Sequence, residues 1–139
     1  MSDTIVIAEL SKGKVSPTTN ELVTAANELG SNPTVIVPCS DSSAANDASN
    51  ISGVTKVIAA KSDVFANYDA AAWAEAIDSV APAGIVITSA SAQSKDLAAR
   101  IAARRSISVV QDVIAINGTT LSTPIYSGKA IQNVAISGD

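Results

Sequence analysis

Four short runs made up mostly of apolar residues limit what this chain can fold into. They are rich in Ile and Val and lie at residues 4–8, 34–37, 54–59 and 84–88. Continuous apolar runs of this length are typical of strands buried on both faces of a parallel sheet, whereas strands with one wet face alternate between apolar and polar residues. The runs therefore predict a mostly parallel sheet that helices cover on both sides.

Segments with helical periodicity separate these runs. The first begins with Thr18 to Glu21, which matches a capping box, and ends at Gly30; the second spans 42–51. The third begins near Asp69 and ends before Pro82, and the fourth follows Ser91. The apolar faces expected for the four helices are Leu22, Ala25, Ala26 and Leu29; Ala44, Ala45, Ala48 and Ile51; Trp73, Ile77 and Val80; and Leu97, Ala98, Ile101 and Ala102.

The last third of the chain has a different pattern. Residues 109–116, 119–126 and 130–136 have the composition of strands, and Asn117-Gly118 between the first two is a hairpin signal. Pro124 indicates that the middle strand has an edge or a bulge there. We therefore expect one domain over residues 1–139, of the α/β class: a three-layer, mostly parallel sheet flanked by helices, with a C-terminal antiparallel hairpin extension.

Composition argues against several classes of function. The net charge is −4, so there is no basic excess to neutralise nucleic acid phosphates. The chain has no His, which rules out a Ser-His or Cys-His pair, and its acidic residues form no metal-ligand pattern. Cys39 is the single cysteine, so no intramolecular disulfide can form; it is either a reactive thiol or a small apolar residue at a strand end.

The strand, turn and helix over residues 84–104 form the best candidate for a ligand site. Free backbone N–H groups at a helix N-terminus favour phosphate, and Ser89, Ser91, Ser94 and Lys95 could assist in binding a nucleotide there. No Gly-rich phosphate-binding fingerprint is present. Two alternatives stay open: Ser-Lys catalysis with Lys95 as the base, or Ser91 as a simple helix cap beside an exposed Lys95.

Three further residues are candidates for an interface. Arg100 and Arg104 are four positions apart, so they share one helix face and could pair with an acidic partner, or simply face solvent. Tyr126, in the C-terminal hairpin segment, could anchor an interface or pack in the core with its hydroxyl at the edge.

The chain resembles the N-terminal domain of the α subunit of electron transfer flavoprotein over essentially all 139 residues. The order and spacing of several segments carry the resemblance: Ile5–Glu9, Leu22–Gly30, Gly53–Ile58, Ser94–Ala103, Asp112–Ala115 and Pro124–Ala130. The chain departs from the usual family residues at Ser94, Ala99, Gln111, Thr123 and Lys129. These departures leave the fold expectation intact but affect exact surface contacts.

The resemblance implies a fold similar to the adenine-nucleotide alpha-hydrolases and a role as the scaffold of an electron carrier rather than as an enzyme. Family members continue into a second domain that binds most of the FAD, and we expect that domain to be absent here. We therefore expect no FAD, metal or catalytic residue in this chain, and docking to a β-like subunit. The alternative is a self-standing domain that binds AMP or ATP near Glu9 and Ser89 to Lys95.

The N-terminal segment and the length of the apolar runs bear on location. The N-terminus enters a strand at Thr4 without a secretion or transit signal, and no apolar run is long enough to span a bilayer. We therefore expect a cytoplasmic protein, or a processed mitochondrial matrix protein if the source is eukaryotic.

Overall fold

A four-stranded parallel sheet with the order β5-β4-β1-β6 forms the centre of the fold. The structure is a computed structural model, and it describes residues 3–11, 13–41, 43–118, 120–125 and 130–135. The strands are β1 (Asp3–Ile7), β2 (Leu10–Ser11), β3 (Lys14–Val15), β4 (Ser31–Cys39), β5 (Lys56–Lys61), β6 (Ile85–Ile87), β7 (Ala115–Asn117), β8 (Thr120–Ile125) and β9 (Ala130–Ala135). The helices are α1 (Thr18–Leu29), α2 (Ser43–Ser49), the 3-10 turn η1 (Asp63–Ala66), α3 (Ala70–Val80) and α4 (Ala92–Arg105).

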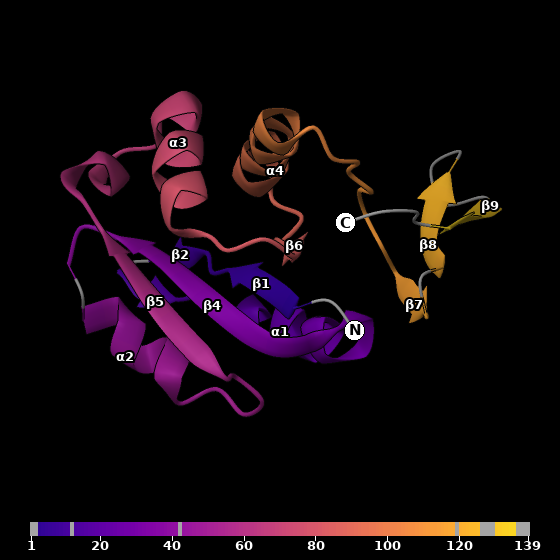
Figure 1. Cartoon of the computed structure of the whole chain (residues 1–139), viewed down its shortest axis with the longest axis horizontal. Coiled ribbons are helices and arrows are strands. Elements are labelled where there is room, and N and C mark those ends of the chain that lie inside the picture. Colours follow the sequence, from indigo (N-terminus) through magenta and orange to yellow (C-terminus); the bar gives the residue numbers. More distant parts are fainter. Residues whose placement is uncertain (1–2, 12, 42, 119, 126–129, 136–139) are drawn as a thin grey trace.

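The central sheet is covered on both faces. Ile5 and Ile7 of β1 belong to the hydrophobic cluster that includes α3 and α4, whereas Val6 and Ala8 belong to the cluster that includes α1 and α2. Figure 1 shows the two pairs of helices on opposite sides of the sheet. The α/β three-layer prediction is therefore confirmed, because successive side chains of a strand point to opposite faces and both faces here are apolar.

The two helices after β5 begin at side-chain caps. Asp69 accepts hydrogen bonds from the backbone N–H groups of Ala71 and Ala72, at 3.1 and 3.2 Å. Ser91 accepts one from the N–H of Ser94 at 3.2 Å. Both caps were predicted from the sequence, because Asp and Ser satisfy N–H groups that the first helical turn leaves unpaired.

Two predicted details of the helices, the cap of α1 and the burial of Val80, are wrong, and a third is incomplete. Thr18 does not cap α1, because Pro17 already has helical backbone angles and the Thr18 hydroxyl lies 3.0 Å from that of Ser16. The stripe predicted for α1 is confirmed at Ala26, which is buried, and at Leu22, which packs against the core, but the prediction missed the buried Val23. Val80, in the last turn of α3, is 41% exposed rather than buried.

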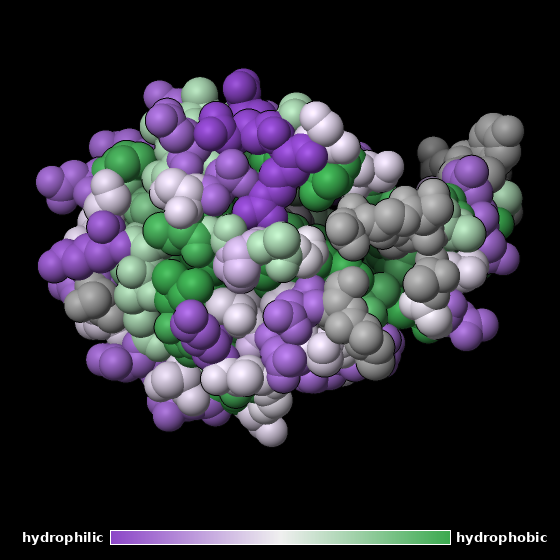
Figure 2. Space-filling model, viewed as in Figure 1, coloured by the Kyte–Doolittle hydropathy of each residue, from purple (hydrophilic) through white to green (hydrophobic). Residues whose placement is uncertain are grey.

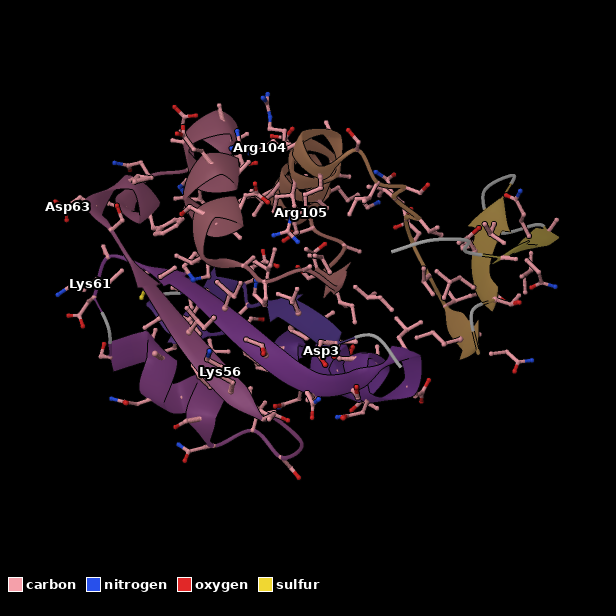
Figure 3. All side chains as sticks on the ribbon, viewed as in Figure 1. Asp3, Lys56, Lys61, Asp63, Arg104 and Arg105 are labelled. Atoms are coloured by element: carbon pink, nitrogen blue, oxygen red, sulfur yellow. The ribbon has the colours of Figure 1, made fainter. Side chains whose placement is uncertain are left out.

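Two prolines lie within β4, where the sequence predicted only residues 34–37. Pro38 pairs with Ala60 of β5, but the pairing of β4 with β1 ends at Ile36, so no ladder bond is lost on that side. β5, which pairs with β4 on the side away from β1, is an edge strand that begins with Lys56 and ends with Lys61 (Figure 3). Charged residues on an edge strand oppose pairing with another chain.

The C-terminal strands form a separate antiparallel sheet with the order β7-β8-β9, which we call the arm. It projects from the main body in Figure 1. Gly118, with φ +62°, follows β7 in the predicted hairpin. The expectation for Pro124 is confirmed: it pairs with Ile131 of β9, but the pairing of β8 with β7 ends at Ser122, so β8 has a free edge there.

Residues 106–114 join α4 to the arm, and we call them the connector. The sequence predicted a strand over 109–116, but only Ala115 and Ile116 of that range are in a strand. Asp112 interrupts the extended run, because its backbone is in the left-handed region at φ +55° and its carboxylate is bound by Lys95. The connector therefore crosses from the body to the arm without a strand partner for most of its length.

Candidate functional site

The residues that follow two neighbouring strands meet at the carboxyl edge of the central sheet. β1 and β6 are parallel neighbours, so Glu9 and Ser89, each two residues past its strand, come together. The Ser89 hydroxyl donates a short hydrogen bond to Oε2 of Glu9. Ser94 Oγ lies 2.9 Å from Ser89 Oγ and can donate to it, so the Glu9 carboxylate ends a chain of two hydroxyls.

The structure places the four predicted nucleotide residues as follows. Ser89, Ser91 and Ser94 are close together at the N-terminus of α4, where Ser91 is the helix cap and Ser94 is buried. Lys95 instead forms an ion pair with Asp112 of the connector, with 2.8 Å between Nζ and Oδ1. Nucleotide binding by these residues stays a prediction, and a phosphate there would compete with the Glu9 carboxylate for the hydroxyls.

Ser-Lys catalysis by Ser91 or Ser94 with Lys95 gains no support from this geometry, whereas Ser91 is a helix cap. The Lys95 ammonium contacts a carboxylate, and the Ser91 and Ser94 hydroxyls are bonded to the helix N-terminus and to Ser89. Within the described ranges, no group of three His, Cys, Asp or Glu side chains could hold a metal ion. None of the helices described in the structure is long and apolar enough to cross a membrane.

A cavity of about 340 Å³ opens beside this hydroxyl chain. The carboxyl ends of β1 and β4 form its floor, and η1, α3 and α4 form its walls. Phe65, Tyr68 and Trp73 line one side. The ring centre of Trp73 lies 5.0 Å from that of Phe65 and 5.2 Å from that of Tyr68, and both contacts are edge to face. Sequence analysis named Glu9 and Ser94 at this edge but missed the aromatic side, because periodicity assigns Trp73 to a helix face and gives no sign that Tyr68 joins it.

The predicted interface arginines are both paired within the chain. Arg100 Nε lies 3.4 Å from Asp96, one helical turn away on α4. Arg104 Nε lies 3.4 Å from Asp78 of α3. Their role at an interface stays a prediction, and Tyr126, the third candidate, lies outside the described residues.

Arg105, which sequence analysis did not select, makes a more extensive set of contacts. Its Nε lies 2.5 Å from Oδ1 of Asp78, and its two terminal nitrogens donate to the carbonyls of Ala81 and Pro82 at 3.0 Å. Figure 3 shows Arg104 and Arg105 on α4 beside α3. The Arg105 guanidinium holds the pKa of Asp78 below its usual value. Arg105 therefore joins the C-terminal end of α3 to α4.

Most of the large apolar side chains that the structure leaves exposed lie on the connector and the arm. Val109, Val113 and Ile114 are exposed on the connector, and Ile131 is exposed on β9. Ile114 and Ile131 are 58% and 62% exposed, more than any other large apolar residue described. In Figure 2, green hydrophobic residues are visible where the body meets the arm. We call these four residues the apolar docking set.

The chain matches the model of one protein family over nearly its whole length. The model of the electron transfer flavoprotein domain family matches residues 4–139. The chain is 32% identical to "Electron transfer flavoprotein subunit alpha, mitochondrial" of Arabidopsis thaliana, over 97% of this chain and 40% of the relative. It is 29% identical to "Electron transfer flavoprotein subunit alpha" of Mycobacterium tuberculosis (strain CDC 1551 / Oshkosh), over 100% of this chain and 45% of the relative. The chain thus spans less than half the length of the curated relatives it matches.

Proposed function

Because the chain belongs to the electron transfer flavoprotein family, we propose that it is a docking domain of such a carrier. In this proposal the chain supplies a rigid α/β body and a surface for a β-like subunit. The FAD that carries the electrons is held by residues outside this chain. The carrier passes electrons from flavin dehydrogenases to an acceptor, and this chain catalyses no reaction itself.

The names of the relatives support a role within a larger assembly. They are named as α subunits of electron transfer flavoproteins, which are carriers, and each is more than twice as long as the part that this chain matches. Some of them are named mitochondrial, which agrees with the proposed location in a mitochondrial matrix if the source is eukaryotic, or in the cytoplasm otherwise.

The observation that carries the proposal is the position of the apolar docking set. Val109, Val113, Ile114 and Ile131 lie on the connector and the arm, outside the central sheet that holds the fold together. Asp112, the single charged residue among 106–118, is already paired with Lys95. Exposed apolar side chains with few charges among them are typical of surfaces that a protein partner covers.

Co-expression with an electron transfer flavoprotein β subunit from the same genome tests this proposal. We expect the two chains to elute together on size-exclusion chromatography. Substitution of Ile114 by Asp should weaken the complex by about 100-fold, because a carboxylate would be buried where an apolar side chain packed. Val80→Asp, which places the same charge on an exposed apolar position of α3, serves as the control and should leave the complex intact.

Separate elution of the unmodified chains, or equal weakening by Ile114→Asp and Val80→Asp, would contradict the proposal. Circular dichroism spectra of both variants should match that of the unmodified chain. Ile131→Asp, on β9, tests the arm in the same way and does not alter the connector.

A further inference from the structure

The cavity beside Glu9 has an unusual charge for a site at the carboxyl edge of a parallel sheet. Among the described residues that line it, Glu9 carries the single formal charge, and no Lys or Arg is present. Oε2 of Glu9 accepts from Ser89, while the structure gives no partner within the described residues to its other oxygen. The described lining therefore presents one carboxylate beside the first turn of α4, where the N–H of Ser94 is already bonded to the Ser91 cap.

Two titratable side chains, Cys39 and Tyr68, line the cavity wall. Burial raises the pKa of the Cys39 thiol, and the nearby Asp41 raises it further by more than Lys61 lowers it. Burial and the hydrogen bond to Asp96 raise the pKa of Tyr68 to about 12, and Arg100 offsets only part of this. At both positions burial is the largest cause, so the raised pKa values indicate a cavity wall that is shielded from water.

The aromatic side of the cavity offers a second attraction for positive charge. Tyr68 and Trp73 line it next to Phe65, and the Trp73 indole N–H is already bonded to the carbonyls of Val64 and Asn67. With that donor satisfied within the chain, the indole needs no polar partner from a ligand. Aromatic rings attract cations through their quadrupole, and they bind the methyl groups of quaternary ammonium ions well.

We propose that this cavity binds a small organic cation of the alkylammonium class. The ammonium group lies against the Glu9 carboxylate, and its apolar substituents pack against Tyr68 and Trp73. A volume of about 340 Å³ accommodates such an ion together with a few waters. The site is distinct from the apolar docking set, so its test does not depend on the proposed partner.

Titration with three probes of different charge tests the proposal. Choline is the cation, 3,3-dimethyl-1-butanol is its uncharged isostere, and AMP is an anion. Trp73 is the only Trp of the chain, so its fluorescence reports directly on the cavity, and amide NMR shifts give an independent readout. We expect choline to bind with a Kd of about 1–10 mM, the isostere to bind about tenfold more weakly, and AMP not to bind.

Two matched substitutions test the role of Glu9. Glu9→Gln keeps the size of the side chain and an acceptor for Ser89 but removes the charge, so we expect about tenfold weaker binding of choline. Glu21→Gln makes the same chemical change on the exposed surface of α1, away from the cavity, and should leave binding unchanged. Tyr68→Leu should weaken binding several-fold, and it tests the site independently if Glu9→Gln fails to fold.

The outcomes separate the possibilities. Binding of choline that is weakened by Glu9→Gln and Tyr68→Leu supports the proposal. Binding of AMP with equal or higher affinity would overturn it in favour of a nucleotide site. Equal binding of the uncharged isostere, or no response in fluorescence and NMR to choline at about 50 mM, would overturn it as well.

Discussion

Replacing Arg105 with Met should destabilise the fold by about 2–4 kcal/mol, whereas replacing Arg104 with Met should cost less than about 1 kcal/mol. Both side chains reach the same carboxylate, that of Asp78. Arg105 is 17% exposed and Arg104 is 46% exposed, so solvent screens the second pair much more than the first. The comparison isolates burial and contact geometry, because Met keeps most of the apolar stem at either position.

The expected loss at Arg105 follows from its contacts. The charge-assisted bond to Asp78, 2.5 Å from Nε, contributes about 1.5–3 kcal/mol, and the bonds to the carbonyls of Ala81 and Pro82 add less, because those carbonyls can bind water instead. Arg104 contacts Asp78 at 3.4 Å and adds little.

The pH dependence has a definite sign. The folded-state pKa of Asp78 is lowered, chiefly by Arg105, so this stabilisation is present above the unfolded pKa of about 4 and is lost as the pH falls through the folded value. Urea unfolding, followed by circular dichroism at pH 7 and near pH 3, gives both free energies for each variant. Equal destabilisation by the two substitutions, or a difference that does not shrink in acid, would refute this reasoning.

Three further substitutions test other features of the fold by urea or thermal unfolding. Thr19→Val should raise the unfolding free energy by about 1 kcal/mol, because the buried Thr19 hydroxyl has no hydrogen-bond partner in the structure; a loss of stability would show that the hydroxyl is satisfied. Gly84→Ala should destabilise by at least about 2 kcal/mol, because its Cβ would lie 2.4 Å from the carbonyl of Asp3 at φ +152°; wild-type stability would contradict this geometry. Ser106→Gly should stabilise by about 0.5–1 kcal/mol, because Ser106 ends α4 in the left-handed region at φ +54°; no gain would mean that this conformation is not strained.

Much of the central fold could be predicted from the sequence, because its signals are local. Strands such as β1 are buried on both faces and therefore read as continuous apolar runs. Asp69 and Ser91 mark helix starts because each side chain bonds to N–H groups within three residues. In both cases the residues that form the structure are also neighbours in the chain.

Other elements depend on contacts that a linear pattern does not contain. The hairpin of β2 and β3 consists of two-residue strands, which are too short to show periodicity. The connector has the β-branched composition of a strand, but the pairing of Asp112 with Lys95, 17 positions earlier, holds it in another conformation. Composition alone therefore overestimated the length of β7.

The candidate sites divide in the same way. Ser89, Ser91 and Ser94 could be selected from one strand-turn-helix segment, and the structure brings them together. The chain of hydroxyls ends at Glu9, 80 positions away, and only the parallel pairing of β1 with β6 makes them neighbours. The sequence therefore indicated the position of the site, but the carboxylate that determines its charge came from the fold.

The most direct test of the proposed function is the visible absorption spectrum of the isolated chain after incubation with FAD and removal of free flavin by size-exclusion chromatography. The account predicts a colourless protein, because the proposed function places the flavin on residues outside this chain. A yellow protein that carries FAD in a stoichiometric amount and is bleached by reductant would contradict it.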